Sequence, residues 1–276
     1  MPNQTLPKKI TSKSNTAKNK MMPNNNGHLW LSPPMILAVG FLFLIATGSS
    51  LLKLPFATIE SVSWLEAAFT ATSAVTVTGL AVVDTANYTY FGQLVIIVLI
   101  QFGGLGFMTF AVLAFFSLQR RLNLTSQKIA REAFAETSFS QITNTAKSVF
   151  MIAICVEMIG FIGLTLCFLP EMSWGQALYQ GFFYTISAFN NAGFALSSDS
   201  LSGYVDHAGI NFIITSLIII GGLGFLVIKD LADNRSWHKI NINTKLILVS
   251  TLGLNLIAFM LFWLLEHNNP ATVTNH

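Results

Sequence analysis

The sequence predicts an all-α membrane protein built from tandem repeats of a span, a pore loop and a second span. Composition is the first observation: of 276 residues, 53% are apolar and only 10% are charged. Soluble domains carry about 25% charged residues, and the mean hydropathy of +0.60 agrees with a membrane setting. The other two observations are long charge-free windows and an internal repeat of the same segments.

Five apolar windows of 18 residues or more are candidates for spanning helices. Only the third contains a charge, Glu157. The segments between the paired spans, around 61–83 and 172–199, are shorter and rich in hydroxyl side chains. The five windows are Met35–Leu52, Tyr90–Leu118, Ser148–Leu169, Ala208–Ile228 and Leu246–Leu265.

Charge placement predicts the orientation. All but Lys53 of the 15 Lys and Arg residues fall in the N-terminal tail, in 120–147 or in 229–245. Basic loops stay on the cytoplasmic side, so we expect a cytoplasmic N-terminus in a multi-pass plasma-membrane protein. All three basic regions lie on the cytoplasmic side of the membrane only if the segments 61–83 and 172–199 enter the membrane and return without crossing it. This distribution also explains the net charge of +3 without nucleic-acid binding.

The chain repeats itself with a long period, which indicates a repeated structural unit. Ser63-Trp64 returns as Ser173-Trp174, and each pair is expected to open a short helix. Ser73-Ala74 returns as Ser187-Ala188, and Gly79 as Gly193, both at an offset of 114. Phe102-Gly-Gly-Leu-Gly-Phe107 returns as Ile220-Gly-Gly-Leu-Gly-Phe225 at an offset of 118.

The repeat divides the chain into six segments. We predict a polar cytoplasmic tail over 1–29, a first repeat over 30–118 and a cytoplasmic linker over 119–147. A second repeat over 148–228 is followed by a linker over 229–243, and 244–276 holds the first span of an incomplete third repeat. Within 119–147, Leu124–Phe134 has the spacing of a short amphipathic helix.

Two short stretches are candidates for an ion-selectivity filter. Non-helical backbone at mid-membrane depth must line a polar cavity or be buried in protein, and its carbonyls can replace the hydration shell of a cation. The preceding short helix would direct its partly negative C-terminus at the cavity. A single copy is equally explained as a turn after a helix, but two copies between paired spans favour a filter. The candidate filter residues are Thr76, Val77, Thr78 and Gly79, with Asn190, Asn191, Ala192 and Gly193.

Other candidate sites are fewer. Glu157 is an intramembrane carboxylate, a type of residue that is costly and often functional, although a carboxyl hydrogen-bonded to a neighbouring helix explains it equally. Gly103–Gly106 lacks the strand and the Lys-Ser/Thr of a phosphate loop, so we expect close helix packing or a bend. Cys155 and Cys167 are about 18 Å apart on one predicted helix, too far for a disulfide. We expect no catalytic residues, no metal site and no enzyme activity.

These motifs resemble the Trk/Ktr/HKT superfamily of potassium transporters. The resemblance rests on Ser73-Ala-Val-Thr-Val-Thr-Gly-Leu80, on Ser187-Ala-Phe-Asn-Asn-Ala-Gly-Phe194 and on the paired Gly-Gly-Leu-Gly-Phe segments. It covers about residues 30–272, and the short N-terminus is most similar to the KtrB type. It implies the K⁺ channel-like transporter fold, filter glycines at Gly79 and Gly193, and K⁺ as the transported ion, with Na⁺ passed or required in some members of the superfamily. It also implies a homodimer in lipid and a cytosolic nucleotide-binding regulatory subunit, with no cofactor in this chain.

One departure from the family is expected to matter. The family builds one pore from four repeats in one chain, whereas two repeats and one further span are present here. The sequence therefore looks like a truncated member. We expect the pore-forming subunit of a K⁺ uptake system; the alternative is a non-conducting fragment, either inert or associated with full-length subunits.

Overall fold

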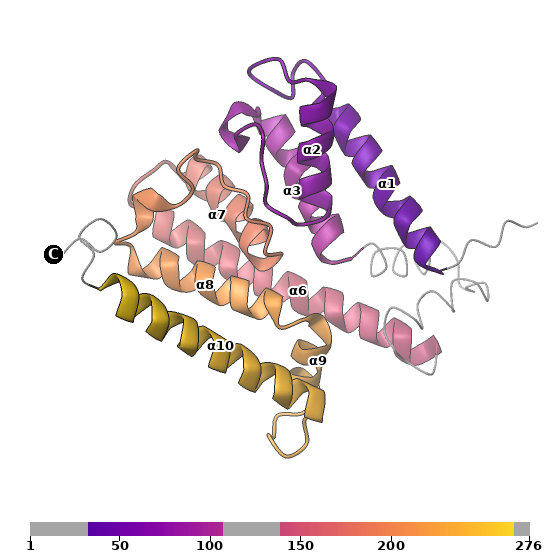
Figure 1. Ribbon diagram of the computed structural model, residues 1–276, viewed down its shortest axis with the longest axis vertical. Helices are drawn as coiled ribbons and strands as arrows, with labels where there is room; N and C mark the ends of the chain where they lie inside the picture. The colour runs from indigo at the N-terminus through magenta and orange to yellow at the C-terminus, as the bar shows by residue number, and fades with distance from the viewer. Residues whose placement is uncertain (1–32, 107–138, 268–276) are drawn as a thin grey trace, which may run out of the picture. The chain divides into compact units, whose positions relative to one another are not determined.

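The structure is a computed structural model that describes residues 33–106 and 139–267 (Figure 1). The chain divides into two units, Met1–Leu31 and Ser32–His276, and every described residue belongs to the second unit. The described residues form helices, and a single isolated β-bridge joins Thr58 to Tyr88. The expected all-α class is confirmed. The predicted linker helix at 124–134 lies outside the described residues.

The first three helices are α1 (Pro33–Leu52), α2 (Trp64–Val75) and α3 (Tyr90–Gly104), and all three pack on one another. Helix α2 begins where the sequence predicts, because Ser63 and Glu66 form a capping box that satisfies two free N–H groups. Lys53, the cation outside the three basic regions, donates its ammonium to the carbonyl of Val62 just before this helix.

The same arrangement follows in α6 (Phe139–Phe168), α7 (Trp174–Phe189) and α8 (Ala208–Gly222), with α7 packed on both longer helices. Ser173 is the N-cap residue of α7, again as expected. Helix α6 begins nine residues before the predicted span. Both cysteines lie on it and are free, in agreement with the sequence prediction.

The predicted span over 208–228 is not one continuous helix. Helix α8 ends at Gly222, and α9 (Phe225–Asp233) begins after Gly224, whose φ is +85°. A residue in this left-handed conformation ends a right-handed helix, and glycine adopts it without a steric penalty. The axes of Ala208–Gly222 and Val227–Asp233 differ by 95° as a result.

Helix α3 shows the same pattern. It ends at Gly104, and Gly106 follows with a φ of +76°. The expected span over Tyr90–Leu118 therefore stops being helical at its glycine run, where we predicted close packing or a bend. Its second part, 107–118, lies outside the described residues.

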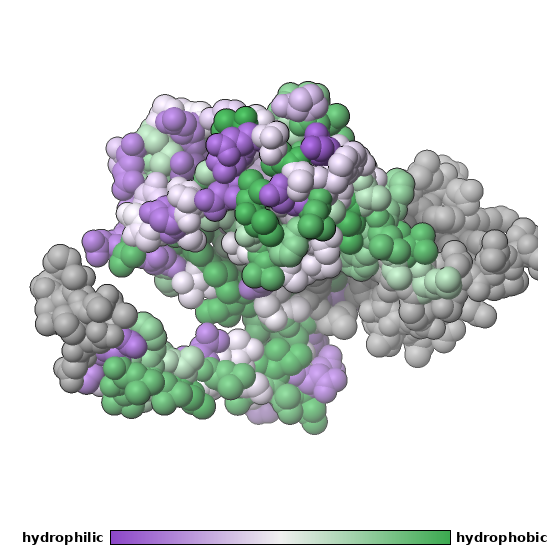
Figure 2. All heavy atoms as spheres, turned by 45° about the horizontal axis from the view of Figure 1, so that its top comes forward, coloured by the Kyte–Doolittle hydropathy of each residue, from purple (hydrophilic) through white to green (hydrophobic). Residues whose placement is uncertain are grey.

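Helix α10 (Ile242–Glu266) matches the last predicted span. By length and composition, two helices within the described ranges can cross a membrane, Lys147–Phe168 and Ile242–Glu266, and a third can if α8 and α9 form one bent span. Large apolar side chains on α10, such as Leu252, Phe259 and Leu265, are exposed. In Figure 2, hydrophilic side chains gather on the upper part of the face and hydrophobic side chains on the lower part, as expected for a protein that meets both water and lipid.

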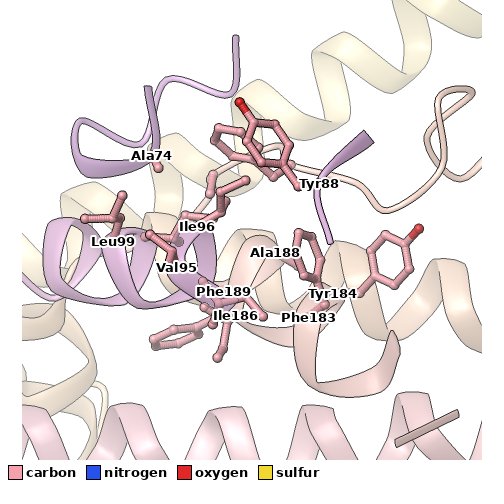
Figure 3. Close-up of a cluster of buried hydrophobic side chains, with 14 of the residues drawn as sticks. Ala74, Tyr88, Val95, Ile96, Leu99, Phe183, Tyr184, Ile186, Ala188 and Phe189 are labelled. Carbon is pink, nitrogen blue, oxygen red and sulfur yellow. The ribbon is translucent and has the colours of Figure 1, made fainter. Parts of the chain in front are cut away.

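The buried core joins α3 to α7. Val95, Ile96 and Leu99 of α3 lie in one cluster with Phe183 and other residues of α7, and side chains from both helices point into it (Figure 3). Because α3 belongs to the first predicted repeat and α7 to the second, this core fixes the two short helices α2 and α7 in one body.

Candidate functional site

Two non-helical segments directly after α2 and α7 form the candidate site. Thr76 is the C-cap of α2 and Asn190 is the C-cap of α7, with nearly the same backbone angles: φ −87° and ψ 0° against φ −80° and ψ 0°. The structure therefore places both predicted filter segments at the C-terminal ends of short helices. The helix dipole makes that end partly negative, which favours a cation.

The backbone hydrogen bonds of the two segments repeat one another. In the first, Thr76, Val77 and Thr78 donate to the carbonyls of Thr72, Ala74 and Ser73. In the second, Asn190, Asn191 and Ala192 donate to the carbonyls of Ile186, Ala188 and Ser187, which are the residues at the offset of 114. The N–H groups are thus directed back toward the short helices. Within the described part of the chain, none of the carbonyl oxygens of 76–79 or 190–193 accepts a hydrogen bond.

The sign of φ alternates along both segments. Val77 and Gly79 have φ of +55° and +73°, and Asn191 and Gly193 have φ of +56° and +71°, whereas the residues between them stay outside the positive region. Alternation of right- and left-handed residues turns successive N–H groups to one side of the strand, which leaves the carbonyls on the other side. This is the arrangement in which backbone oxygens can replace water around a cation.

The two segments lie against each other at their glycines. A Cβ placed on Gly79 would lie 2.5 Å from the carbonyl oxygen of Ala192 and 3.3 Å from the Cα of Gly193. A side chain at position 79 therefore has no room, in addition to the unfavourable φ. The predicted role of glycine at the end of each segment agrees with this geometry.

A hydroxyl at the same position of each short helix restrains each segment. Ser73 accepts from the Thr78 hydroxyl at 3.1 Å, and Ser187 donates to the carbonyl of Phe194 at 2.6 Å. Both serines are buried. The repeated Ser-Ala pair of the sequence is therefore a structural part of the site.

The glycine runs let the longer helices approach the short ones. A Cβ on Gly103 would lie 2.0 Å from the carbonyl oxygen of Val75, the last residue of α2. A Cβ on Gly221 would lie 1.7 Å from the carbonyl oxygen of Phe189, the last residue of α7. The close packing expected at 103–106 is present and occurs again at the second run, and both contacts support the short helices where the candidate filter segments begin.

Glu157 lies beside the second segment. Its side chain is 8% exposed. Gln101 Nε2 donates to both carboxylate oxygens, at 2.9 Å to Oε1 and 3.0 Å to Oε2. Asn190 Nδ2 donates to Gln101 Oε1 at 3.0 Å and approaches Glu157 Oε1 at 3.5 Å. Glu157 is therefore hydrogen-bonded to a neighbouring helix and to the start of the second candidate filter segment.

Comparison with known proteins identifies the family. The sequence profile described as "TrkH: Cation transport protein" matches residues 35–232. This chain belongs to the TrkH family. The resemblance inferred from the filter segments is confirmed, and with it the assignment to a family of membrane cation transporters.

Curated TrkH-family relatives extend this match. The chain is 44% identical to Ktr system potassium uptake protein B of Bacillus subtilis (strain 168) over 243 residues, which is 88% of this chain and 55% of the relative. It is 40% identical to the Vibrio alginolyticus protein of the same name, with 87% and 53% coverage. Potassium/sodium uptake protein NtpJ of Enterococcus hirae is 36% identical, with 88% and 54% coverage. The chain thus spans about half the length of the curated relatives it matches.

Sequence reasoning missed Gln101 in this TrkH-family site. The available signal was an amide side chain inside a charge-free apolar window, two residues before the glycine run. Such a residue is costly in a membrane unless it is hydrogen-bonded, and Glu157 carries the same signal 56 residues later. Pairing them requires α7 to pack on both α3 and α6, which the sequence pattern does not state.

Proposed function

We propose that this chain forms part of the translocation pathway of a potassium uptake system. Monovalent cations pass single file along the carbonyls of 76–79 and 190–193. The observation that carries the proposal is the matching pair of segments with alternating φ, whose carbonyl oxygens accept no hydrogen bond from the residues that the structure describes. The names of the relatives, which refer to potassium uptake and in one case to potassium and sodium, support K⁺ as the ion and Na⁺ as a second one.

The remaining parts of the proposal concern the setting. The basic regions favour a multi-pass protein of the plasma membrane with a cytoplasmic N-terminus. The family resemblance supports a homodimer in lipid, a cytosolic nucleotide-binding regulatory subunit and no cofactor in this chain. Transport rather than catalysis is the function, because carbonyls are the groups that the site presents.

The test is growth of a K⁺-uptake-deficient cell that expresses this chain. Rescue at low K⁺ supports the proposal and rules out the alternative of a non-conducting fragment. Lack of rescue by a chain that reaches the membrane favours that alternative, whether the fragment is inert or associates with full-length subunits.

Glycine substitutions test the filter itself. Gly79→Ser is expected to lower K⁺ over Na⁺ discrimination by about tenfold, which corresponds to about 1.4 kcal/mol, because a Cβ there meets the Ala192 carbonyl. Gly193→Ser should act in the same direction but less strongly, since its Cβ meets only the Gly79 Cα at 3.5 Å. Gly203→Ser is the matched control, because nothing lies within 4 Å of its Cβ. Unchanged uptake ratios in both filter variants would rule out this filter.

A further inference from the structure

The first residue of the second filter segment is held from outside its own repeat. Asn190 Nδ2 donates to the carbonyl of Ile186 in α7 at 3.0 Å and to Gln101 Oε1 of α3 at 3.0 Å. Its backbone N–H is bonded to the Ile186 carbonyl as well. The side chain of Asn190 therefore connects the start of the filter segment to a helix of the first repeat.

Gln101 is in turn held by Glu157. Its single amide nitrogen donates to both carboxylate oxygens of Glu157, on α6. A buried carboxylate is tolerated only when it is hydrogen-bonded, so turning the amide away would cost the carboxylate both of these bonds and leave it only the longer contact from Asn190 at 3.5 Å. The bonds to Glu157 thus fix the orientation in which Gln101 presents its oxygen to Asn190.

Helix α3 restrains Asn190 at a second point. A Cβ on Gly104 would lie 2.0 Å from Asn190 Oδ1. That oxygen is buried and has no hydrogen-bond partner in the described part of the chain. The side chain of Asn190 is therefore confined between a steric contact at Gly104 and a polar contact at Gln101.

The first filter segment lacks these partners. Thr76, which corresponds to Asn190, bonds through its hydroxyl to Thr72 of its own short helix at 2.7 Å. In the first repeat, the residues 115 and 114 positions before Glu157 are Leu42 and Phe43, and both are apolar. In the second repeat, the residue 118 positions after Gln101 is Ile219, which is also apolar. A hydrogen-bonded group that occurs in one repeat and not in the other is not required by the repeated architecture. The group formed by Gln101, Glu157 and Asn190 therefore belongs to the junction between α3, α6 and the second segment.

We propose that Gln101 and Glu157 are positioning residues that set the second filter segment through Asn190, and that they thereby contribute to cation discrimination. This role rests on the proposed function. Neither side chain needs to touch the ion. The pair determines where the Asn190 backbone lies relative to the first repeat, and hence where the carbonyls of 190–193 face.

The test exchanges the two side chains. Gln101→Glu places two carboxylates together, which disfavours the charged pair, and Glu157→Gln removes the acceptor that orients Gln101. The exchange variant Q101E/E157Q restores one carboxylate and one amide. Met158→Leu is the control, because Met158 is next to Glu157 but half exposed. Two quantities are measured in each variant: the ratio of K⁺ to Na⁺ uptake, and the rise in Tm that K⁺ produces over Na⁺ in detergent.

We expect Gln101→Glu to lower the uptake ratio by about tenfold and to remove the K⁺-specific rise in Tm. Q101E/E157Q should recover most of both, and Met158→Leu should change neither. The inference would be overturned if the variant has a lower Tm in ion-free buffer but keeps both the K⁺ to Na⁺ uptake ratio and the K⁺-specific rise in Tm. Gln101 and Glu157 would then act on stability alone. Failure of the exchange variant to recover would also overturn it.

The two proposals fail differently. If the chain without substitutions shows neither K⁺-selective uptake nor a K⁺-specific rise in Tm, the proposed function is contradicted. The positioning role of Gln101 and Glu157 is then contradicted as well. An unchanged chain that discriminates, together with a Gln101→Glu variant that discriminates equally, contradicts only the role of Gln101 and Glu157.

Discussion

At the scale of single residues, glycine decides how closely α8 approaches the second filter segment. Gly221 and Gly222 are adjacent, but they face different surroundings. A Cβ on Gly221 would lie 1.7 Å from the Phe189 carbonyl oxygen, whereas the nearest atom to a Cβ on Gly222 is Asn191 Nδ2 at 3.8 Å. The first position therefore requires glycine, and the second has space for a methyl group.

The two glycines give a matched pair of variants. Gly221→Ala is expected to destabilise the protein by about 1–3 kcal/mol, the usual cost of forcing an extra methyl group into a packed site. Gly222→Ala should be neutral, because its Cβ makes an ordinary contact. Unfolding in detergent, followed by circular dichroism, measures both. Equal stability of the two variants would contradict the close approach of α8 to Phe189.

At the scale of elements, Asp230 joins α9 to the start of α10. Its carboxylate accepts from the backbone N–H of Asn241 at 2.9 Å and from Asn234 Nδ2 at 2.8 Å. The hydrogen bond from the Thr244 side chain and those from Asn241 and Asn234 hold the pKa of Asp230 below its usual value, against the opposing effect of burial. Asn241 is the N-cap of α10 and makes no side-chain cap bond, so Asp230 supplies the acceptor at this helix start.

The lowered pKa of Asp230 sets the direction of a pH effect. A carboxyl whose pKa is depressed on folding stabilises the fold above its unfolded pKa of about 3.9. That contribution is lost as the pH falls through the folded pKa. We expect Asp230→Asn to lower the Tm at pH 7, and the difference from the unchanged protein to shrink as the pH is lowered below about 4.

The control lies on the same helix. Asp233 pairs with Lys229 at 3.1 Å, but its side chain is 61% exposed, and exposed ion pairs contribute little to stability. Asp233→Asn should therefore leave the Tm nearly unchanged at both pH values. A constant Tm difference for Asp230→Asn across the pH range would show that its charge is not involved.

At the scale of the whole molecule, polar contacts join the two repeats at two levels. Gln101 and Glu157 form the first. At the second, the Tyr179 hydroxyl of α7 donates to Gln93 Oε1 of α3 at 2.6 Å, and the rings of Tyr179 and Tyr90 meet edge to face. The apolar cluster of Figure 3 adds Val95, Ile96 and Leu99 of α3 to the same junction. The repeats are therefore expected to unfold together.

A double-mutant cycle on Tyr179→Phe and Gln93→Met tests this junction. We expect a coupling energy of about 1 kcal/mol, since the hydrogen bond is partly buried and joins a buried Gln93 to a half-buried Tyr179. Each single variant should lower the Tm of the entire unfolding transition. Strictly additive effects, or a transition that splits into two in the unchanged protein, would contradict a cooperative junction between the repeats.

Much of the site could be predicted from local sequence. Ser63 and Ser173 mark the starts of α2 and α7 because capping depends on a few neighbouring residues. Gly79 and Gly193 were expected to adopt unusual backbone angles because glycine is the residue that does so freely. The positive φ of Val77 could not be predicted, since the surrounding structure imposes it on a β-branched residue that resists it, whereas Asn191 is of a type that adopts it more readily.

The break between α8 and α9 shows where apolar patterning fails. A continuous apolar window predicts one span, because hydropathy records length and polarity but not direction. Gly224 sits in that window without interrupting it, and its left-handed conformation turns the chain. The run Gly-Gly-Leu-Gly carried the relevant signal, and the sequence interpretation placed a bend only at the first of its two copies.

By itself, the sequence determined the all-α membrane class, the repeated motifs, the positions of both candidate filter segments and the family. Each of these depends on composition, on spacing along the chain or on the conformational limits of single residues. Only the tertiary structure decided that Gln101, Glu157 and Asn190 form one hydrogen-bonded group, and that Gly79 lies against Gly193. These contacts join residues that are 33 to 114 positions apart, and they arise from the packing of α7 against both α3 and α6.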